Sequence, residues 1–453
     1  MSAETPRQVA LSVLNDLTRG HANLDQLLNS RFASPGADMS RRDRALAYAI
    51  IYGVLRWRAR VDWYITAFAS RPINQIKPEI LNILRIGLFQ MLFLSKIPQS
   101  AAVNTSVEMA KKSAPPQVVR FVNGLLRNAA RRPEAVTWPD PEKDPIKALA
   151  VNESFPQWLI RRWQKRYGIE ETRQLCRYLN EIPPVTIRAN ALKTTREALI
   201  KALAGAGNNP EPTRWAGNGI ALPGLQGPIP DLPGFEEGWF QVQDEAAQLA
   251  TRVLAPEPGE TILDACAGLG GKTGHIAQCM DNRGKIVAMD NDNQKLEDLL
   301  SAMQRLGVHI AQTRCHDLEG AFDRADAGRF DRVLVDAPCS GLGVIRRNPD
   351  IKWAAGKRDF PRYQQKQIRL LTHAAQGLGP DGILVYAVCS MEPEETDAVI
   401  SEFCKDADNF EVEPAGSVLP ELADLADRQG FLRLLPHRHH TDGFFIARLR
   451  RRR

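Results

Sequence analysis

LDACAGLGGKTGHIA, residues Leu263 to Ala277, joins the end of an apolar strand to a glycine-rich turn and the start of a helix. Glycines at such a turn let the backbone approach a ligand, and the free N–H groups at the helix N-terminus can bind it. The pattern is neither GxGxxG nor a Walker A loop, so it does not favour a nucleotide phosphate. It predicts the ligand-binding turn of a doubly wound α/β domain.

Strand and helix patterns alternate around this turn. The predicted strands cover residues 261–264, 285–290, 308–314, 332–336 and 382–388. Helical patterns lie between them, among them 293–306 and 363–377. Such alternation predicts a mostly parallel, doubly wound sheet.

Acidic residues follow successive strands of this sheet. Asp290 ends the second strand, Asp317 follows the third and Asp336 ends the fourth. An acid at the end of the second strand is placed to bind ribose hydroxyls. The glycine turn and these acids together predict an adenosine cofactor that needs no phosphate contact. A generic turn with acids in solvated loops is the alternative interpretation.

Two cysteines follow the last two parallel strands. Cys339 lies in DAPCSGLG after the fourth strand and Cys389 in YAVCS after the fifth. Both thiols would face one crevice if these strands are neighbours. One thiolate can add to C6 of a pyrimidine, which lets C5 take a methyl group from a sulfonium donor. The second cysteine can then assist proton removal and release, and Asp336 can hydrogen-bond the base. The residues alone do not rank the two cysteines, and a disulfide pair is the competing interpretation.

The rest of the chain predicts a three-part organisation. Residues 1–135 have the pattern of a helical bundle, and residues 136–150, rich in proline and charge, are a predicted linker. A small α+β module is expected at 151–240 and the α/β domain at 241–453. Residues 1–150 contain 21 Lys and Arg against 12 Asp and Glu, a charge of +9 that indicates a polyanionic partner.

Composition excludes several classes of protein. The 453 residues are 43% hydrophobic and 25% charged, a normal globular mixture. The N-terminus lacks the apolar segment of a secretory signal, and the most apolar stretch, 81–94, is too short to span a bilayer. Seven cysteines without a repeated spacing argue against a disulfide framework and predict a cytoplasmic protein. No metal site is expected, because the cluster of His437, His439 and His440 lacks spaced partner ligands.

Together these motifs resemble the bacterial 16S ribosomal RNA cytosine-C5 methyltransferases of the Fmu/Sun (RsmB) type. The resemblance covers nearly the whole chain. The matching segments are RAN (188–190), GWFQVQDEAAQL (238–249), DACAGLGGKT (264–273), DAPCSGLGVIRRNPDIKW (336–353), YAVCS (386–390) and DGFFIARL (442–449). It implies a Rossmann-like, S-adenosylmethionine-dependent methyltransferase domain, preceded by an all-α NusB-type RNA-binding domain and a small α+β middle module.

The resemblance also implies roles for individual residues. Cys389 matches the nucleophile and Cys339 the residue that assists product release, although DNA cytosine methyltransferases use the PC cysteine as nucleophile. Lys272 is also expected to orient Asp336. The family usually has AAPGGKT where residues 267–273 read AGLGGKT, and loss of the proline's fixed φ predicts a shift in cofactor affinity without loss of activity. The residues that match S-adenosylmethionine contacts are Cys266, Ala267, Gly268, Leu269, Gly270, Gly271, Lys272, Asp290, Asp317 and Asp336.

A basic stretch is a candidate RNA-binding segment. Residues 346–369 contain eight Lys and Arg against two Asp, with aromatic residues interleaved. Basic groups neutralise phosphates and aromatic rings stack on unpaired bases. The candidate RNA contacts are Arg346, Arg347 and Lys352. Because the target base must leave its stack to react, an unpaired or loop region of RNA is expected.

The predicted function is methylation of cytosine C5 in 16S ribosomal RNA by covalent cysteine addition at C6, with cytosine 967 as the target that the resemblance implies. Another RNA, such as a tRNA, is an alternative substrate. A non-catalytic RNA-binding assembly factor is the alternative from a different class, against which the complete set of Cys339, Cys389 and Asp336 argues. No membrane or DNA partner is expected, and the oligomeric state stays open.

Overall fold

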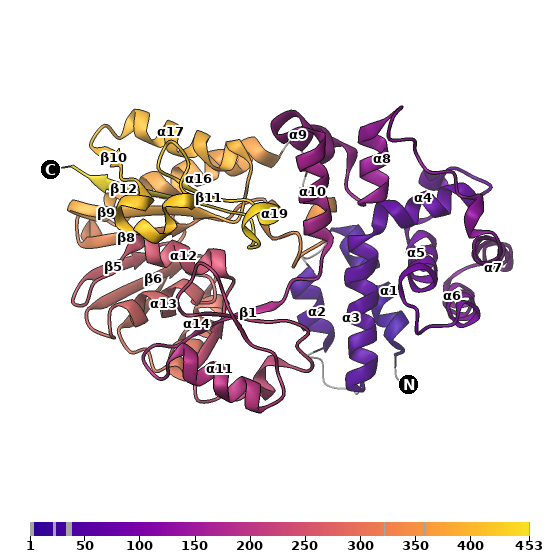
Figure 1. The fold of residues 1–453 in the computed structure, drawn as a ribbon, viewed down its shortest axis with the longest axis horizontal. Coiled ribbons are helices and arrows are strands. Elements are labelled where there is room, and N and C mark those ends of the chain that lie inside the picture. The colour runs from indigo at the N-terminus through magenta and orange to yellow at the C-terminus, as the bar shows by residue number, and fades with distance from the viewer. Residues whose placement is uncertain are drawn as a thin grey trace. The chain divides into compact units, whose positions relative to one another are not determined.

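The computed structural model describes residues 4–20, 24–32, 39–320, 322–354, 356 and 359–452, apart from the side chain of Arg324. These residues form two compact units, both drawn in Figure 1. The helical unit combines Met1–Asn180 with Asn348–Ala354, and the sheet unit combines Glu181–Arg347 with Ala355–Arg453.

The helical unit is a bundle built around one central helix, α5. Ile83, Leu84 and Leu88 of α5 have no exposed surface, and α5 packs against α1, α3, α4, α6 and α7. Thr5 and Gln8 form a capping box that satisfies free backbone groups at the start of α1. The helices are α1 (Pro6–Arg19), α2 (Leu24–Phe32), α3 (Arg41–Arg56), α4 (Arg58–Phe68), α5 (Pro78–Phe93), α6 (Gln99–Ser113), α7 (Pro116–Arg131), α8 (Pro145–Asn152), α9 (Gln157–Tyr167), α10 (Ile169–Asn180) and α15 (Ile351–Ala354).

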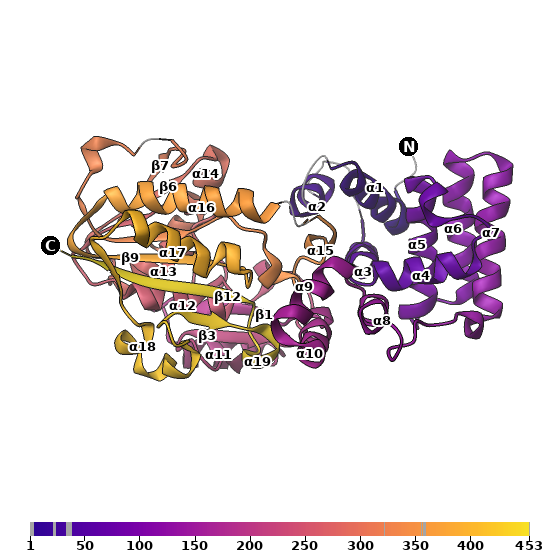
Figure 2. The ribbon, with the colours of Figure 1, turned by 90° about the horizontal axis from the view of Figure 1, so that it is seen from above.

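The segment Asn348–Ala354, which includes α15, completes this bundle from far along the chain (Figure 2). Lys352 has no exposed surface. Its ammonium group donates to Arg56 O at 3.1 Å, to Ser154 O at 3.2 Å and to Asn180 Oδ1 at 2.6 Å. The segment is therefore an integral part of the helical unit.

The structure divides the chain differently from the sequence analysis. The sequence patterns place 151–180 in the middle module and 348–354 in the α/β domain, whereas both segments belong to the helical unit. The reason is packing between distant residues. Trp353 Nε1 donates to Leu55 O at 2.6 Å, across an interval of 298 residues that no local pattern reports.

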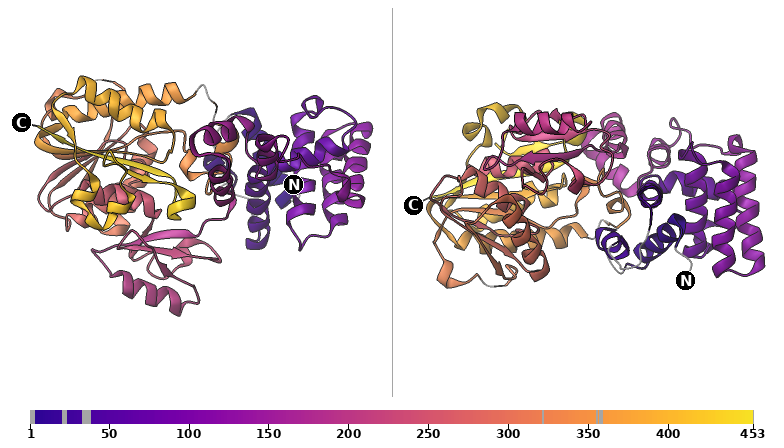
Figure 3. Two further views of the ribbon diagram at one scale, coloured as in Figure 1. Left: turned by 45° about the horizontal axis from the view of Figure 1, so that its top comes forward. Right: turned by 90° about the horizontal axis from the view of Figure 1, so that it is seen from below.

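The sheet unit begins with a small antiparallel sheet (Figure 3). Its strands lie in the order β2-β3-β1-β4. Leu199 and Leu203 of helix α11 (Arg196–Gly205) pack against Ile187 and Ile220. This is the small α+β module that the sequence predicts. The strands are β1 (Val185–Ala189), β2 (Glu211–Pro212), β3 (Gly219–Leu222) and β4 (Phe240–Val242).

A larger sheet of eight strands follows, in the order β10-β12-β9-β8-β5-β6-β7, with β11 paired to β12. Strands β5 to β9 pair in parallel, whereas β10, β11 and β12 pair antiparallel. The third predicted strand starts at Ala311 and not at Val308, because the Val308 N–H closes the end of the preceding helix on Met303 O. The strands are β5 (Thr261–Asp264), β6 (Lys285–Asp290), β7 (Ala311–Cys315), β8 (Phe330–Asp336), β9 (Leu378–Val388), β10 (Phe410–Val412), β11 (Leu432–Leu434) and β12 (Phe444–Arg451).

Helices cover both faces of this sheet (Figure 1). Alternate residues of a strand enter opposite cores, as Ile262 and Leu263 of β5 do. In the part of the chain that the structure describes, no helix combines the length and the apolar character needed to cross a membrane. One face carries α12 (Glu245–Leu254), α13 (Gly271–Cys279) and α14 (Asn293–Leu306), and the other carries α16 (Asp359–Gln376) and α17 (Asp397–Asp406).

Candidate active site

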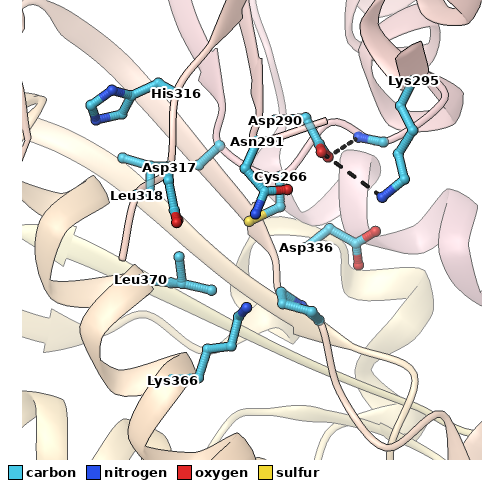
Figure 4. A pocket seen from close by; sticks show the side chains of 13 residues that line it. Cys266, Asp290, Asn291, Lys295, His316, Asp317, Leu318, Asp336, Lys366 and Leu370 are labelled. Carbon is cyan, nitrogen blue, oxygen red and sulfur yellow. Dashed lines mark hydrogen bonds and ion pairs between the residues drawn. The ribbon is translucent and has the colours of Figure 1, made fainter. Parts of the chain in front are cut away.

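A cavity of about 370 Å³ opens at the carboxyl ends of the parallel strands (Figure 4). This is the edge at which open parallel sheets bind ligands. Five of the predicted cofactor residues line it: Cys266, Gly268, Asp290, Asp317 and Asp336. The other five belong to the same glycine-rich turn but are not among the described lining residues: Ala267, Leu269, Gly270, Gly271 and Lys272.

The glycine-rich turn depends on backbone conformations that favour glycine. Gly268 and Gly270 have φ angles of +53° and +82°. A Cβ on Gly270 would lie 2.6 Å from Leu299 Cγ, so packing also excludes a side chain there. The Gly268 N–H donates to Asp290 Oδ2 at 3.0 Å, which fixes the turn to the end of β6.

The cavity offers hydrogen-bond acceptors, apolar surface and negative charge. Asp290 accepts two backbone N–H groups, which leaves further lone pairs for hydroxyl groups. Leu318, Pro338 and Leu370 present apolar surface to a flat ring, and Asp317 adds a carboxylate. These groups suit the ribose, the adenine and the cationic sulfonium of S-adenosylmethionine.

Two carboxylates near the turn have partners within the protein. Lys272 Nζ forms an ion pair with Asp336, the contact that the sequence leads us to expect. Asp264 is fully buried at the end of β5 and accepts a hydrogen bond from Thr273 Oγ1 at 2.7 Å. Burial raises the pKa of Asp264 to about 6, although the Thr273 hydrogen bond and the Lys272 charge act in the opposite direction.

The small sheet supports the helices that follow the turn. Arg188 of β1 is fully buried, and its guanidinium donates to Gly271 O at 2.9 Å and to Gln278 Oε1 at 3.2 Å. Asn190 Nδ2 donates to Leu306 O at 2.8 Å. Burial lowers the pKa of Arg188 to about 9. The RAN motif therefore holds α13 and α14 in place, a role that the sequence analysis did not assign.

The two cysteines face each other at the end of neighbouring strands. β8 and β9 pair in parallel, and Cys339 Sγ lies 3.3 Å from Cys389 Sγ, with both present as free thiols. The hydrogen bond with Cys389, together with burial, raises the pKa of Cys339 well above its usual value. The Gly343 N–H donates to Cys389 O at 3.0 Å. A Cβ on Gly343 would lie 2.0 Å from Gly443 O, so the crossing of these loops has no room for a side chain.

Glu395 is a residue of this region that the sequence analysis missed. It has no exposed surface, and its carboxylate accepts hydrogen bonds from Ser340 and Ser390. These serines directly follow the two cysteines in the chain. The available signal was the acidic MEPEE (391–395), which comes directly after the CS motif.

Arg346 and Arg347, two of the candidate RNA contacts, have partners inside the sheet unit. The Arg346 side chain is 6% exposed and lies 3.6 Å from the Glu181 carboxylate. Arg347 donates to Asp244 Oδ2 and to Asp442 Oδ2, both at 2.7 Å. These ion pairs raise the pKa of Arg347 despite the opposing effect of burial. Both arginines therefore have structural roles in the loop that follows Cys339.

The position of Lys352, the third candidate, does not fit a contact with RNA. Its side chain has no exposed surface, and its three hydrogen bonds are made to acceptors of the helical unit. An ammonium in this position cannot reach a phosphate. We therefore assign Lys352 a structural role in place of the predicted RNA contact.

Three family models match successive parts of the chain. Residues 4–131 match the NusB family, and residues 155–226 match the ferredoxin-like domain of RsmF/B-like methyltransferases. Residues 251–450 match the family described as 16S rRNA methyltransferase RsmB/F. The order of the three agrees with the architecture described above.

Curated proteins match the chain over nearly its full length. The probable ribosomal RNA small subunit methyltransferase B of Bacillus subtilis (strain 168) is 36% identical over 100% of both chains. The protein of the same name from Synechocystis sp. is 37% identical over 98% of this chain and 99% of the relative. Ribosomal RNA small subunit methyltransferase B of Escherichia fergusonii is 35% identical over 91% of each.

Solved structures support the same assignment. The crystal structure of PH0851 has a TM-score of 0.81 and 27% identity, over 99% of both chains. A methyltransferase homolog protein from Pyrococcus horikoshii has a TM-score of 0.57 and 29% identity, over 68% of this chain and 99% of that one. Since full-length relatives match and the three domain families occur in order, the chain belongs to the RsmB/F family of S-adenosylmethionine-dependent 16S rRNA methyltransferases.

Proposed function

We propose that this protein methylates cytosine C5 in 16S ribosomal RNA, at cytosine 967, by covalent addition of Cys389 to C6 of the base. The observation that carries the proposal is the pair of opposed thiols, with Cys339 Sγ 3.3 Å from Cys389 Sγ. The names of the full-length relatives support the choice of small-subunit ribosomal RNA as substrate. The resemblance described above supports the target position.

The residues around the cavity hold the cofactor and the base. S-adenosylmethionine supplies the methyl group. Asp290 binds the ribose hydroxyls, and Cys266, Gly268 and Asp317 complete the cavity wall. Asp336, which is oriented by its ion pair with Lys272, hydrogen-bonds the N3 and N4 edge of the cytosine and stabilises charge that develops there.

Covalent addition makes C5 reactive. The Cys389 thiolate forms a bond to C6, and the electron pair of the C5–C6 double bond becomes available at C5. The ring N3 takes up a proton from solvent as the ring gains negative charge, and the Asp336 carboxylate accepts the hydrogen bond of the resulting N3–H. C5 can then take up the methyl group, because the ring carbon has become a nucleophile.

Cys339 acts after the methyl group has been transferred. Its hydrogen bond with Cys389 is the largest cause of its raised pKa. That hydrogen bond is lost once the Cys389 sulfur is bonded to C6, so Cys339 releases its own proton to solvent more easily, and the thiolate can then accept the proton of C5. Removal of the C5 proton restores the C5–C6 double bond and expels Cys389 as a thiolate.

The test is methyl transfer from labelled S-adenosylmethionine to unmodified 16S ribosomal RNA. We expect transfer by the wild type, no measurable transfer by Cys389→Ala, and a protein–RNA adduct that accumulates with Cys339→Ala. Cys404→Ala is the matched control and should keep full activity, because this half-buried thiol lies on α17 and belongs to neither of the two cysteine loops. Replacing cytosine 967 should abolish transfer.

Each other outcome identifies a different alternative. An adduct that accumulates with Cys389→Ala in place of Cys339→Ala would exchange the roles of the two cysteines. Methyl transfer to tRNA alone would show that tRNA is the substrate. A wild-type protein that methylates no RNA would favour the role of an assembly factor. Action in the cytoplasm is part of the proposal and is supported by the seven free thiols.

A further inference from the structure

Glu395 is a fully buried acid between the two cysteine loops. It ends a short 3-10 helix, Pro393–Glu395, that follows the loop after β9, and it has no exposed surface. A carboxylate at such a position needs hydrogen-bond donors, because burial of an unsatisfied charge is strongly unfavourable. The donors that Glu395 has are therefore informative about what the residue does.

Four hydrogen bonds reach its two oxygens. Oε1 accepts from Ser340 N–H at 2.7 Å and from Gln367 Nε2 at 3.3 Å. Oε2 accepts from Ser340 Oγ and from Ser390 Oγ, both at 2.5 Å. The donors come from the loop after β8, the loop after β9 and helix α16, so one carboxylate joins three elements of the sheet unit.

Two of these donors are the immediate chain neighbours of the cysteines. Ser340 follows Cys339 and Ser390 follows Cys389. A side chain that fixes both serines also limits the movement of both thiols, which lie 3.3 Å apart. Hydrogen bonds to a carboxylate are shorter and stronger than those between neutral groups, so the restraint is stiff.

The backbone of Glu395 is fixed as well. Tyr386 Oη, at the end of β9, donates to Glu395 O at 2.8 Å, and the Glu395 N–H donates to Glu392 O at 3.0 Å. The backbone of Glu395 is thus anchored from the strand that leads to Cys389. Its position depends on the sheet and not on a flexible side chain alone.

We propose that Glu395 is a positioning residue that holds the loops of Cys339 and Cys389 at the separation needed for addition and release. The kinetic consequence of this proposal rests on the two-cysteine mechanism proposed above. Its structural consequence, a fixed distance between two thiols, is independent of what the enzyme methylates.

The primary test measures that distance directly. A short, thiol-specific bifunctional reagent is applied to the full-length protein, and the Cys339–Cys389 cross-link is quantified by mass spectrometry of the digested product. We expect Glu395→Gln to lower the rate of cross-linking about tenfold and Glu395→Asp to lower it further, because aspartate is one methylene too short to reach both serines. Glu402→Gln, an exposed position on α17, is the matched control and should cross-link like the wild type.

Kinetics provide the second measurement. Misplacement of a reacting group by about 1 Å can cost about 10²-fold in rate, so Glu395→Asp should lower kcat by about this factor. KM for RNA and the Kd for S-adenosylmethionine should stay within about threefold, since Glu395 is not among the described residues that line the cavity. A variant that only loses folded protein would instead lower kcat and cross-linking in proportion to the folded fraction measured by circular dichroism.

Serine variants keep the proposal testable if Glu395 variants fail to fold. Ser340→Ala and Ser390→Ala each remove one hydroxyl donor, and the double variant should show the Glu395→Gln phenotype. Ser417→Ala, exposed after β10, is their control. Wild-type cross-linking and kcat in folded Glu395→Gln and in the double serine variant would overturn the proposal. Slowed cross-linking in a protein that proves unable to methylate ribosomal RNA would retain the positioning role and reject only the proposed function.

Discussion

Glu395 in the sheet unit and Lys352 in the helical unit are both ionisable side chains with no exposed surface. Glu395 accepts four hydrogen bonds from serine, glutamine and backbone groups. Lys352 donates three, to two backbone carbonyls and one amide oxygen, and lies 3.7 Å from the centre of the Phe155 ring. None of these hydrogen-bond partners carries an opposite charge. Both side chains are therefore stabilised by the dipoles of neutral polar groups.

The difference lies in what the partners are attached to. The donors to Glu395 include the serines beside the two cysteines, whereas the acceptors of Lys352 lie at or just after helix ends. Arg56 ends α3, Asn180 ends α10, and Ser154 follows the end of α8. Helix C-termini carry partial negative charge, which suits an ammonium group. A buried charge can therefore serve chemistry or folding, and only its neighbours show which.

The largest expected effect comes from breaking the Lys352 site. Lys352→Met keeps the side-chain length but leaves three buried acceptors without their donor, at about 1–3 kcal/mol each. We expect the helical unit to lose about 3 kcal/mol or more, with the affinity for S-adenosylmethionine unchanged. Thermal unfolding, with hydrogen exchange of the α10 amides as the local readout, measures the loss. Lys405→Met, at an exposed position on α17, should leave the stability unchanged. Equal stability of the two variants would show that Lys352 does not stabilise the helical unit.

A smaller effect is expected where the cysteine loops cross. Gly343→Ala would place a methyl group 2.0 Å from Gly443 O and 2.9 Å from Cys389 O, and backbone atoms cannot rotate away. Overpacking of this kind costs about 1–3 kcal/mol, and we expect methyl transfer to fall at least about tenfold. Gly124→Ala, in the exposed interior of α7, meets no atom within 4 Å and should raise stability by about 0.5–1 kcal/mol. Full activity of Gly343→Ala would show that the loops tolerate displacement.

The smallest expected effect concerns Asp350, a half-buried acid that has fewer hydrogen-bond donors than Glu395. Its Oδ1 has no hydrogen-bond partner among the described residues, and burial raises its pKa to about 6. Because the folded protein binds this proton more tightly than the unfolded chain, the group reduces stability as the pH rises from about 4 to 6. Asp350→Asn should therefore gain about 1–2 kcal/mol at pH 7.5 and almost nothing at pH 3. Urea unfolding at both pH values measures the gain, with exposed Asp298→Asn as the control. A gain that does not depend on pH would contradict the stated cause.

The sequence was sufficient for features that local patterns encode. The bounds of β5, β6 and α14 agree with those predicted. The meeting of Cys339 and Cys389 follows from two strand ends and the rule that parallel strands present their carboxyl ends at one edge. These inferences need only short segments and a general rule of sheet geometry.

Features that depend on distant partners could not be predicted in this way. The basic run of 346–369 has the composition of an RNA-binding surface, yet Lys352 is bound by residues 296, 198 and 172 positions away in the chain. Composition shows that a charged residue is present but not which residues it contacts in the folded protein. Glu395 was missed for the same reason, because its donors Ser340 and Gln367 lie 55 and 28 positions away in the chain.

The segment Asn348–Ala354 also has a consequence for the order in which the protein is made. The helices that it completes end at Asn180, so the ribosome must add 174 further residues before the helical unit has all its parts. At about 5–20 residues per second, this delay is on the order of 10 to 35 s. During that time the donor of three acceptors near the ends of α3, α8 and α10, the Lys352 ammonium group, has not yet been synthesised. A nascent chain that ends before Lys352 therefore contains all the helices up to α10 but lacks the segment that completes the helical unit.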